Sequence, residues 1–133
     1  MVDKYAPDII WFDSWLDEIP ENYRQKMVAH HFNTAVTRDQ KPVVAYKQED
    51  LPANVGVLDM EKSGKPKLSD NYWMSDITIS QGSWCYTKGL TYKEPSLIIR
   101  NMIDIWSKRG VVLLNISPKA SGTIPDEQKE ILS

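Results

Sequence analysis

The sequence has very little cysteine, since Cys85 is the only one among 133 residues. A single cysteine excludes an internal disulfide and a zinc site built from cysteines. The chain also has no basic block, and its net charge of -2 gives no footprint for nucleic acid or for an anionic membrane surface. No apolar run approaches membrane-spanning length, and the amino terminus turns acidic at Asp3 without an apolar signal core. We therefore expect no nucleic-acid or membrane partner and no secretion signal in this chain, and the localisation stays unknown.

Apart from these absences, the composition fits a folded α/β protein. Hydrophobic residues make up 41% of the chain and charged residues 26%, close to globular averages. Strand and helix patterns alternate along the sequence. The expected strands are 9–13, 42–46, 56–59, 72–80 (extended) and 111–116, and the expected helices are 21–38, 95–108 and 125–132. This alternation predicts a parallel sheet with right-handed crossovers.

Asp13 is the first candidate for chemistry. Four apolar residues, Ile9 to Phe12, run directly into its carboxylate, and Trp15 follows two positions later. Such a run predicts a strand buried on both faces, with Asp13 at the carboxyl end where parallel α/β folds collect their functional groups. A carboxylate beside tryptophans suits a sugar site, because it can attack an anomeric carbon while an indole packs on the pyranose. The alternative is an aspartate that caps the following loop.

Three sequence blocks occur in a fixed order. Residues 7–13 read PDIIWFD, residues 83–86 read SWCY, and residues 107–125 read SKRGVVLLNISPKASGTIP. Together they resemble the α-L-fucosidases of glycoside hydrolase family 29, over nearly the whole chain. The resemblance implies a (β/α)8 TIM-type barrel, which usually needs about 250 residues. We therefore expect residues 1–133 to be a single truncated catalytic domain, a partial barrel that corresponds to its carboxyl-terminal half.

The resemblance also assigns the two acids. Asp13 matches the family's nucleophile, and Glu61, in the segment VLDMEK, matches the usual acid/base candidate, with Asp59 as the runner-up. Retaining glycosidases place two such carboxyl groups about 5 Å apart. Asp13 must stay ionised, whereas Glu61 must be protonated when it meets the leaving oxygen. The alternative for Glu61 is a solvated loop residue. No cofactor is implied, because a pair of carboxyl groups performs this hydrolysis.

Four further residues form the expected substrate-binding set. Lys47 stands where many family members have an arginine near the sugar; the alternative is an ordinary surface lysine. Trp15 and Trp84 are candidate sugar-stacking platforms, and Asp59 completes the set. Asp13, Asp17 and Glu18 lack a matching histidine or a calcium-loop glycine pattern, so we expect no metal site.

Other residues are interpreted as structural. Trp11 and Trp106 lie inside apolar patterns and are expected in the core, whereas Trp73 suits either role. His30 and His31 point about 100° apart on a helix, so we expect one to be packed and the other solvated. Cys85 replaces a family glycine, and would strain its loop if that position needs a positive φ.

A half-barrel raises the question of association. It would expose open sheet edges and an inner face meant to be filled by all eight strands. We therefore expect a homo-oligomer whose copies cover these surfaces. The predicted function is a retaining α-L-fucosidase that acts on fucosylated glycans. A catalytically inactive fucose-binding module and an inert fragment of a larger fucosidase are the alternatives.

Overall fold

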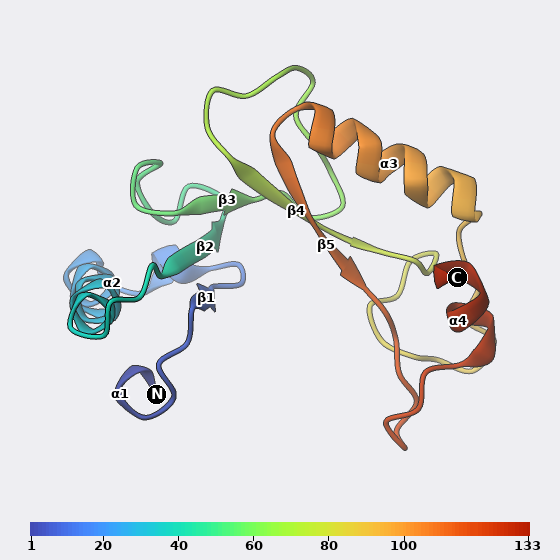
Figure 1. Cartoon of the computed structure of the whole chain (residues 1–133), viewed down its shortest axis with the longest axis horizontal. Helices are drawn as coiled ribbons and strands as arrows, with labels where there is room; N and C mark the ends of the chain where they lie inside the picture. The colour runs from blue at the N-terminus through green and yellow to red at the C-terminus, as the bar shows by residue number, and fades with distance from the viewer. The chain divides into compact units, whose positions relative to one another are not determined.

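Parallel strands and helices make up the chain, as the sequence pattern predicts, although no helix separates the second, third and fourth strands (Figure 1). The computed structural model describes residues 1–133, which divide into two units, Met1–Asp59 and Met60–Ser133. None of the helices combines the length and the apolar character that crossing a lipid bilayer requires. The expectation of a single catalytic domain stays a prediction.

The first unit holds three parallel strands. Its elements are α1 (Val2–Tyr5), β1 (Ile9–Trp11), a 3-10 turn (Leu16–Glu18), α2 (Glu21–Val36), β2 (Val43–Lys47) and β3 (Val57–Asp59). Strand β2 pairs with β1 on one side and with β3 on the other. The sequence predicted these elements to within two residues at most ends, but it missed α1 and the 3-10 turn.

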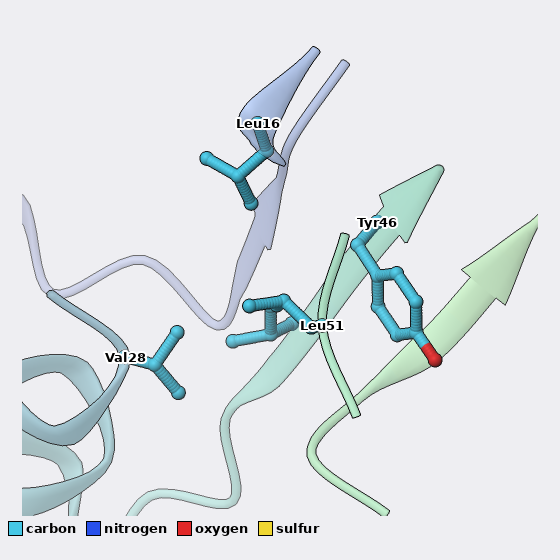
Figure 2. Close-up of a cluster of buried hydrophobic side chains, with 5 residues drawn as sticks. Leu16, Val28, Tyr46 and Leu51 are labelled. Atoms are coloured by element: carbon cyan, nitrogen blue, oxygen red, sulfur yellow. The ribbon is translucent and has the colours of Figure 1, made fainter. Parts of the chain in front are cut away.

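One face of the first sheet packs against α2. Because side chains alternate along a strand, Val44 and Tyr46 of β2 point to the same face. Val28 of α2 packs there, together with Leu16 and Leu51, and Figure 2 shows the side chains converging. Gly56 precedes β3 where a Cβ atom would lie 2.3 Å from the Val44 carbonyl oxygen, so this close approach requires glycine.

The opposite face of β1 is exposed, and here the sequence prediction was wrong. Ile9 and Trp11 were expected inside a strand buried on both faces, but both are exposed, and Trp11 keeps 44% of its surface open. Val43, the register partner of Ile9 on β2, is exposed as well. Ala45, Lys47 and Asp59 lie on the same face and are buried. The exposure is therefore confined to β1, which pairs with β2 alone in the first unit, and to the first residue of β2.

The second unit has two parallel strands and two helices. Its elements are β4 (Trp73–Thr78), α3 (Pro95–Ser107), β5 (Gly110–Asn115) and α4 (Asp126–Leu132). Six residue pairs join β4 to β5, from Trp73 with Gly110 to Thr78 with Asn115. The segment at 63–67 contains no helix or strand, as its composition predicts.

Trp73 is the centre of the second core. Its side chain is fully buried against Ile77 and Ile105, and its indole N–H donates to the Lys108 carbonyl oxygen at 2.8 Å. At Gly110 an added Cβ would lie 2.7 Å from the Trp73 ring and 2.8 Å from the Ile105 carbonyl oxygen. Strand, helix and indole therefore meet at a point that has no room for a side chain.

The histidine prediction is confirmed, whereas one tryptophan prediction is wrong. His31 is buried, and His30 is half-exposed and lies 3.0 Å from the Asp3 carboxylate. Trp106, expected in the core, is 54% exposed. Ile98 and Ile105 of α3 share the buried face, and Trp106 is turned about 100° away from Ile105.

Candidate active site

The register of the first sheet brings three charged side chains together. Lys47 pairs with Asp59 across β2 and β3, and Trp11 pairs with Ala45, two residues before Lys47. Asp13 follows Trp11 by two residues, and alternation therefore predicts the same face. The Lys47 Nζ atom lies 3.4 Å from Asp13 Oδ1 and 3.8 Å from Asp59 Oδ2. The carboxyl ends of three neighbouring strands thus supply a lysine between two carboxylates.

The three side chains differ sharply in burial. The side chain of Asp59 is 0% exposed, that of Lys47 is 7% exposed, and that of Asp13 is 84% exposed. The indole N–H of Trp11 donates to Asp59 Oδ2 at 3.0 Å, and the Lys47 ammonium lies 5.5 Å from the Trp11 ring centroid. The Trp11 ring therefore contacts both buried groups, with its N–H on Asp59 and its face toward Lys47, and of the three charged side chains only Asp13 faces solvent.

The surroundings of Asp13 favour its charged form. The Ser14 backbone N–H donates to Asp13 Oδ1 at 2.8 Å, and this bond is the main cause that lowers the pKa of Asp13 below its usual value. Slight burial opposes the effect, and the Lys47 charge adds to the lowering of the pKa. Asp13 is thus ionised at mildly acidic pH, which is the state that a nucleophile needs.

Trp15 stands beside this cluster in an unusual backbone conformation. Its φ is 74° and its ψ is 23°, in the left-handed region that tryptophan rarely adopts, and its side chain is exposed. Such outliers persist only where the surroundings impose them, and they gather at functional sites. The role of Trp15 as a sugar platform stays a prediction.

We expect Trp15→Gly to stabilise the fold by about 1 kcal/mol, because glycine adopts a positive φ without strain. Urea unfolding of the two proteins measures the change in the free energy of unfolding. The same variant should bind fucose more weakly if the indole is a platform. A less stable variant would mean that the exposed indole makes contacts that outweigh the strain.

Glu61 belongs to the second unit. It is exposed, it makes polar contact, and its two neighbours are fixed to β4. The Met60 N–H donates to the Met74 carbonyl oxygen, and the Lys62 N–H donates to the Asp76 carbonyl oxygen, both at 2.9 Å. The backbone around Glu61 is therefore held as an extension of strand pairing. Its separation from Asp13, about 5 Å in a retaining site, stays a prediction.

Trp84, the other predicted platform, has one face in contact with a cation. The Lys62 ammonium lies 4.2 Å from its ring centroid and donates to the Gly82 carbonyl oxygen at 3.1 Å. The Trp84 carbonyl oxygen accepts from the Asn115 amide at 2.9 Å and from the Ser117 hydroxyl at 3.0 Å. The loop is thus fastened to the end of β5, and a sugar on that face of Trp84 would meet Lys62.

Cys85 causes no backbone strain in this loop. The residue does not have a positive φ, whereas Gly82 does, at 89°. The Cys85 N–H donates to the Ser83 hydroxyl at 3.2 Å, and the thiol is exposed. The structure therefore removes the conformational objection to cysteine at the family's glycine position.

A groove of the first unit lies on the other face of the sheet. It has a volume of about 990 Å³ and lies between α2 and the segment that follows β2. Tyr46 and Leu58 line it, and both point away from the face that carries Lys47 and Asp59. This groove is therefore separate from the charged cluster. No group of three His, Cys, Asp or Glu side chains is arranged to hold a metal ion.

Sequence reasoning missed the part that Trp11 has in the cluster. Its apolar setting indicated a core residue, yet its ring is half-exposed and its N–H is bonded to a buried carboxylate. A signal was available, because Trp11 and Asp13 are two residues apart and therefore share a face of the strand.

The sequence model of the α-L-fucosidase family matches residues 1–133. The chain belongs to the α-L-fucosidase family. Among solved structures, an α-L-fucosidase is 26% identical with a TM-score of 0.81, over 98% of this chain and 29% of the other. The Thermotoga maritima α-fucosidase in complex with fucose is 26% identical with a TM-score of 0.74, over 98% of this chain and 28% of the other.

A third fucosidase is similar enough to support the fold, but not the function, of this chain. Isoenzyme 1 from Paenibacillus thiaminolyticus is 24% identical with a TM-score of 0.72, over 94% of this chain and 32% of the other. A search of curated protein sequences gave no match. The chain spans less than a third of the length of the two fucosidases described first. The predicted fold class, a partial TIM-type barrel with parallel strands and alternating helices, is confirmed by these likenesses.

Proposed function

We propose that this chain carries the catalytic carboxylates of a retaining α-L-fucosidase that hydrolyses terminal α-L-fucosyl linkages. The observation that carries the proposal is the cluster of Asp13 and Lys47 at the carboxyl ends of parallel strands, in a chain of the α-L-fucosidase family. Parallel α/β sheets place their ligands at this end of the strands. Asp13 is the exposed and ionised member, and it is the one suited to attack.

The proposed reaction has two steps. Asp13 Oδ attacks the anomeric carbon and forms an ester bond, while the bond to the aglycone oxygen breaks and Glu61 gives that oxygen its proton. Water then attacks the same carbon, Glu61 takes a proton from the water, and the bond to Asp13 breaks. Two inversions give net retention. Trp15 and Trp84 would pack on the sugar, Lys47 would place a positive charge beside the nucleophile, and Asp59 would support it.

The test of this function is hydrolysis of an aryl α-L-fucoside by the purified chain, with proton NMR on the released fucose. Initial release of the α-anomer is the expected result. Initial release of the β-anomer would contradict the retaining mechanism. Fucose binding without turnover would leave the chain as a sugar-binding module, and neither binding nor turnover would leave it as an inert fragment.

We expect activity to fall at low pH as Asp13 becomes protonated. Its pKa lies below the usual value, so the acid limb of kcat/KM should lie in the acidic range. Replacing Lys47 by glutamine removes a positive charge and should raise the pKa of Asp13. The acid limb should then move to higher pH in Lys47→Gln. A limb that stays in place, or that moves to lower pH, would show that Lys47 does not support the ionised nucleophile.

The proposal includes self-association of the chain. Each unit leaves apolar strand residues exposed: Ile9, Trp11 and Val43 in the first, and Val111 and Leu113 in the second. Apolar surface of this kind favours self-association. We expect a homo-oligomer in sedimentation velocity, and we expect Val111→Lys to lower its mass toward that of the 15.3 kDa chain. A wild-type monomer at micromolar concentration would refute this.

A further inference from the structure

One oxygen atom of Asp59 links the tryptophan, the lysine and the nucleophile. Asp59 Oδ2 accepts the Trp11 indole N–H at 3.0 Å and lies 3.8 Å from Lys47 Nζ. The same ammonium lies 3.4 Å from Asp13 Oδ1. Lys47 is therefore a cation shared between a buried carboxylate and an exposed one.

The distances show that neither pair is tight. A direct bond between an ammonium and a carboxylate is usually about 2.7–2.9 Å long. Both ion pairs of Lys47 are longer than that, at 3.4 and 3.8 Å. A charge in the interior is screened less than one in water, so the buried Asp59 attracts Lys47 more strongly than its distance alone suggests. The Trp11 N–H satisfies part of the Asp59 charge and limits that attraction.

We propose that Asp59 is a positioning residue, which holds the Lys47 ammonium back from Asp13 so that the attacking oxygen keeps its charge without a tight ion pair. A carboxylate held in a tight ion pair is a weaker nucleophile, because the contact must break before attack. Trp11 sets the balance, since its N–H competes with Lys47 for the same oxygen. This inference rests on the proposed role of Asp13 and extends it to two residues that do not themselves react.

Two other polar groups of the first unit help to design the test. The Ser14 N–H is fixed on Asp13 Oδ1. Asp50, the second buried carboxylate, accepts the Leu16 N–H at 3.3 Å. Asp50 therefore provides a matched control: a buried carboxylate of the same unit that is bonded to a backbone amide.

The test is the titration of Asp13, followed by carbon-13 NMR of labelled aspartate carboxyl groups and assigned with Asp13→Asn. Asp59→Asn removes the attraction of the buried carboxylate for Lys47, so Lys47 should move closer to Asp13 and the Asp13 midpoint should move to lower pH. In Trp11→Phe, Asp59 should draw Lys47 away, and the midpoint should move to higher pH. Asp50→Asn should leave it in place. These readings need no turnover, so they are independent of whether the chain is active.

A double-variant cycle separates positioning from direct repulsion between the two carboxylates. If Asp59 acts through Lys47, the shift caused by Asp59→Asn should largely vanish in the Lys47→Gln background. An equal shift in both backgrounds would overturn the proposal, because Asp59 would then act on Asp13 directly. No shift in Asp59→Asn, or a shift of the same sign in Trp11→Phe, would also overturn it. If Asp59→Asn does not fold, the sign of the Trp11→Phe shift still decides.

If the purified chain hydrolyses the aryl fucoside, its kinetic constants give a second test of the positioning role. Asp59→Asn should lower kcat more than it raises KM, with the acid limb of the profile moved to lower pH. Lost hydrolysis with an unchanged Asp13 titration would overturn the positioning role. The predicted titrations without hydrolysis in any variant, wild type included, would instead count against the proposed function.

Discussion

Asp13→Ala should abolish hydrolysis of an aryl α-L-fucoside, with a fall in kcat of at least about 10³-fold, because the variant has no group that can form the glycosyl ester. Fold stability should change little, since the side chain is 84% exposed and contacts only the Ser14 amide and Lys47. Circular dichroism and initial rates measured on the same preparation check both parts.

Two matched variants sharpen this prediction. Asp13→Asn keeps the shape but not the charge, and should lose as much activity as the alanine variant. Asp8→Asn alters another exposed aspartate of the same segment, and should retain full activity. Activity that survives in Asp13→Asn would assign the nucleophile to another carboxylate, and equal losses in all three variants would indicate damage to the segment as a whole.

Trp73→Ala should cost about 3–5 kcal/mol of stability, because it leaves a large cavity in the core of the second unit. Trp73 is fully buried and packs against Ile77 and Ile105. The change also leaves the Lys108 carbonyl oxygen without the indole N–H that lies 2.8 Å from it. A loss of this size is a large share of the stability of a small domain, so unfolding in urea should begin at much lower concentration.

Trp106→Ala is the control for this second prediction. Trp106 is 54% exposed on α3, so its removal should cost less than about 1 kcal/mol. Trp73→Phe should lie between the two alanine variants, because it keeps much of the ring volume but not the donor. Equal costs for Trp73→Ala and Trp106→Ala would contradict the core assignment.

The fold was predictable from the sequence because its periodicity is strong. The apolar pattern of Ile98, Met102, Ile105 and Trp106 predicts α3 to within one residue at its carboxyl end. Ile98 and Ile105 are buried, whereas Trp106 is exposed. The burial of each tryptophan side chain was not predictable in the same way. Trp106 lies in an apolar pattern and was expected in the core, whereas Trp73 suited either role, yet Trp73 is the one that is buried.

The charged cluster was predictable in part. Lys47 and Asp59 each end a strand, and Asp13 follows one, so parallel pairing brings them to the same edge. The sequence did not reveal that Asp59 is fully buried or that Trp11 is bonded to it. Those facts depend on strand register and on which face is left uncovered, and a single sequence specifies neither directly.

The measurement that tests the central claim most directly is covalent trapping. The chain is incubated with a fucosyl donor whose ester intermediate breaks down slowly, then digested and analysed by mass spectrometry. We expect one fucosyl group on the peptide that contains Asp13, and none in Asp13→Ala. A fucosyl group on any other carboxylate, with Asp13 unlabelled, would contradict it.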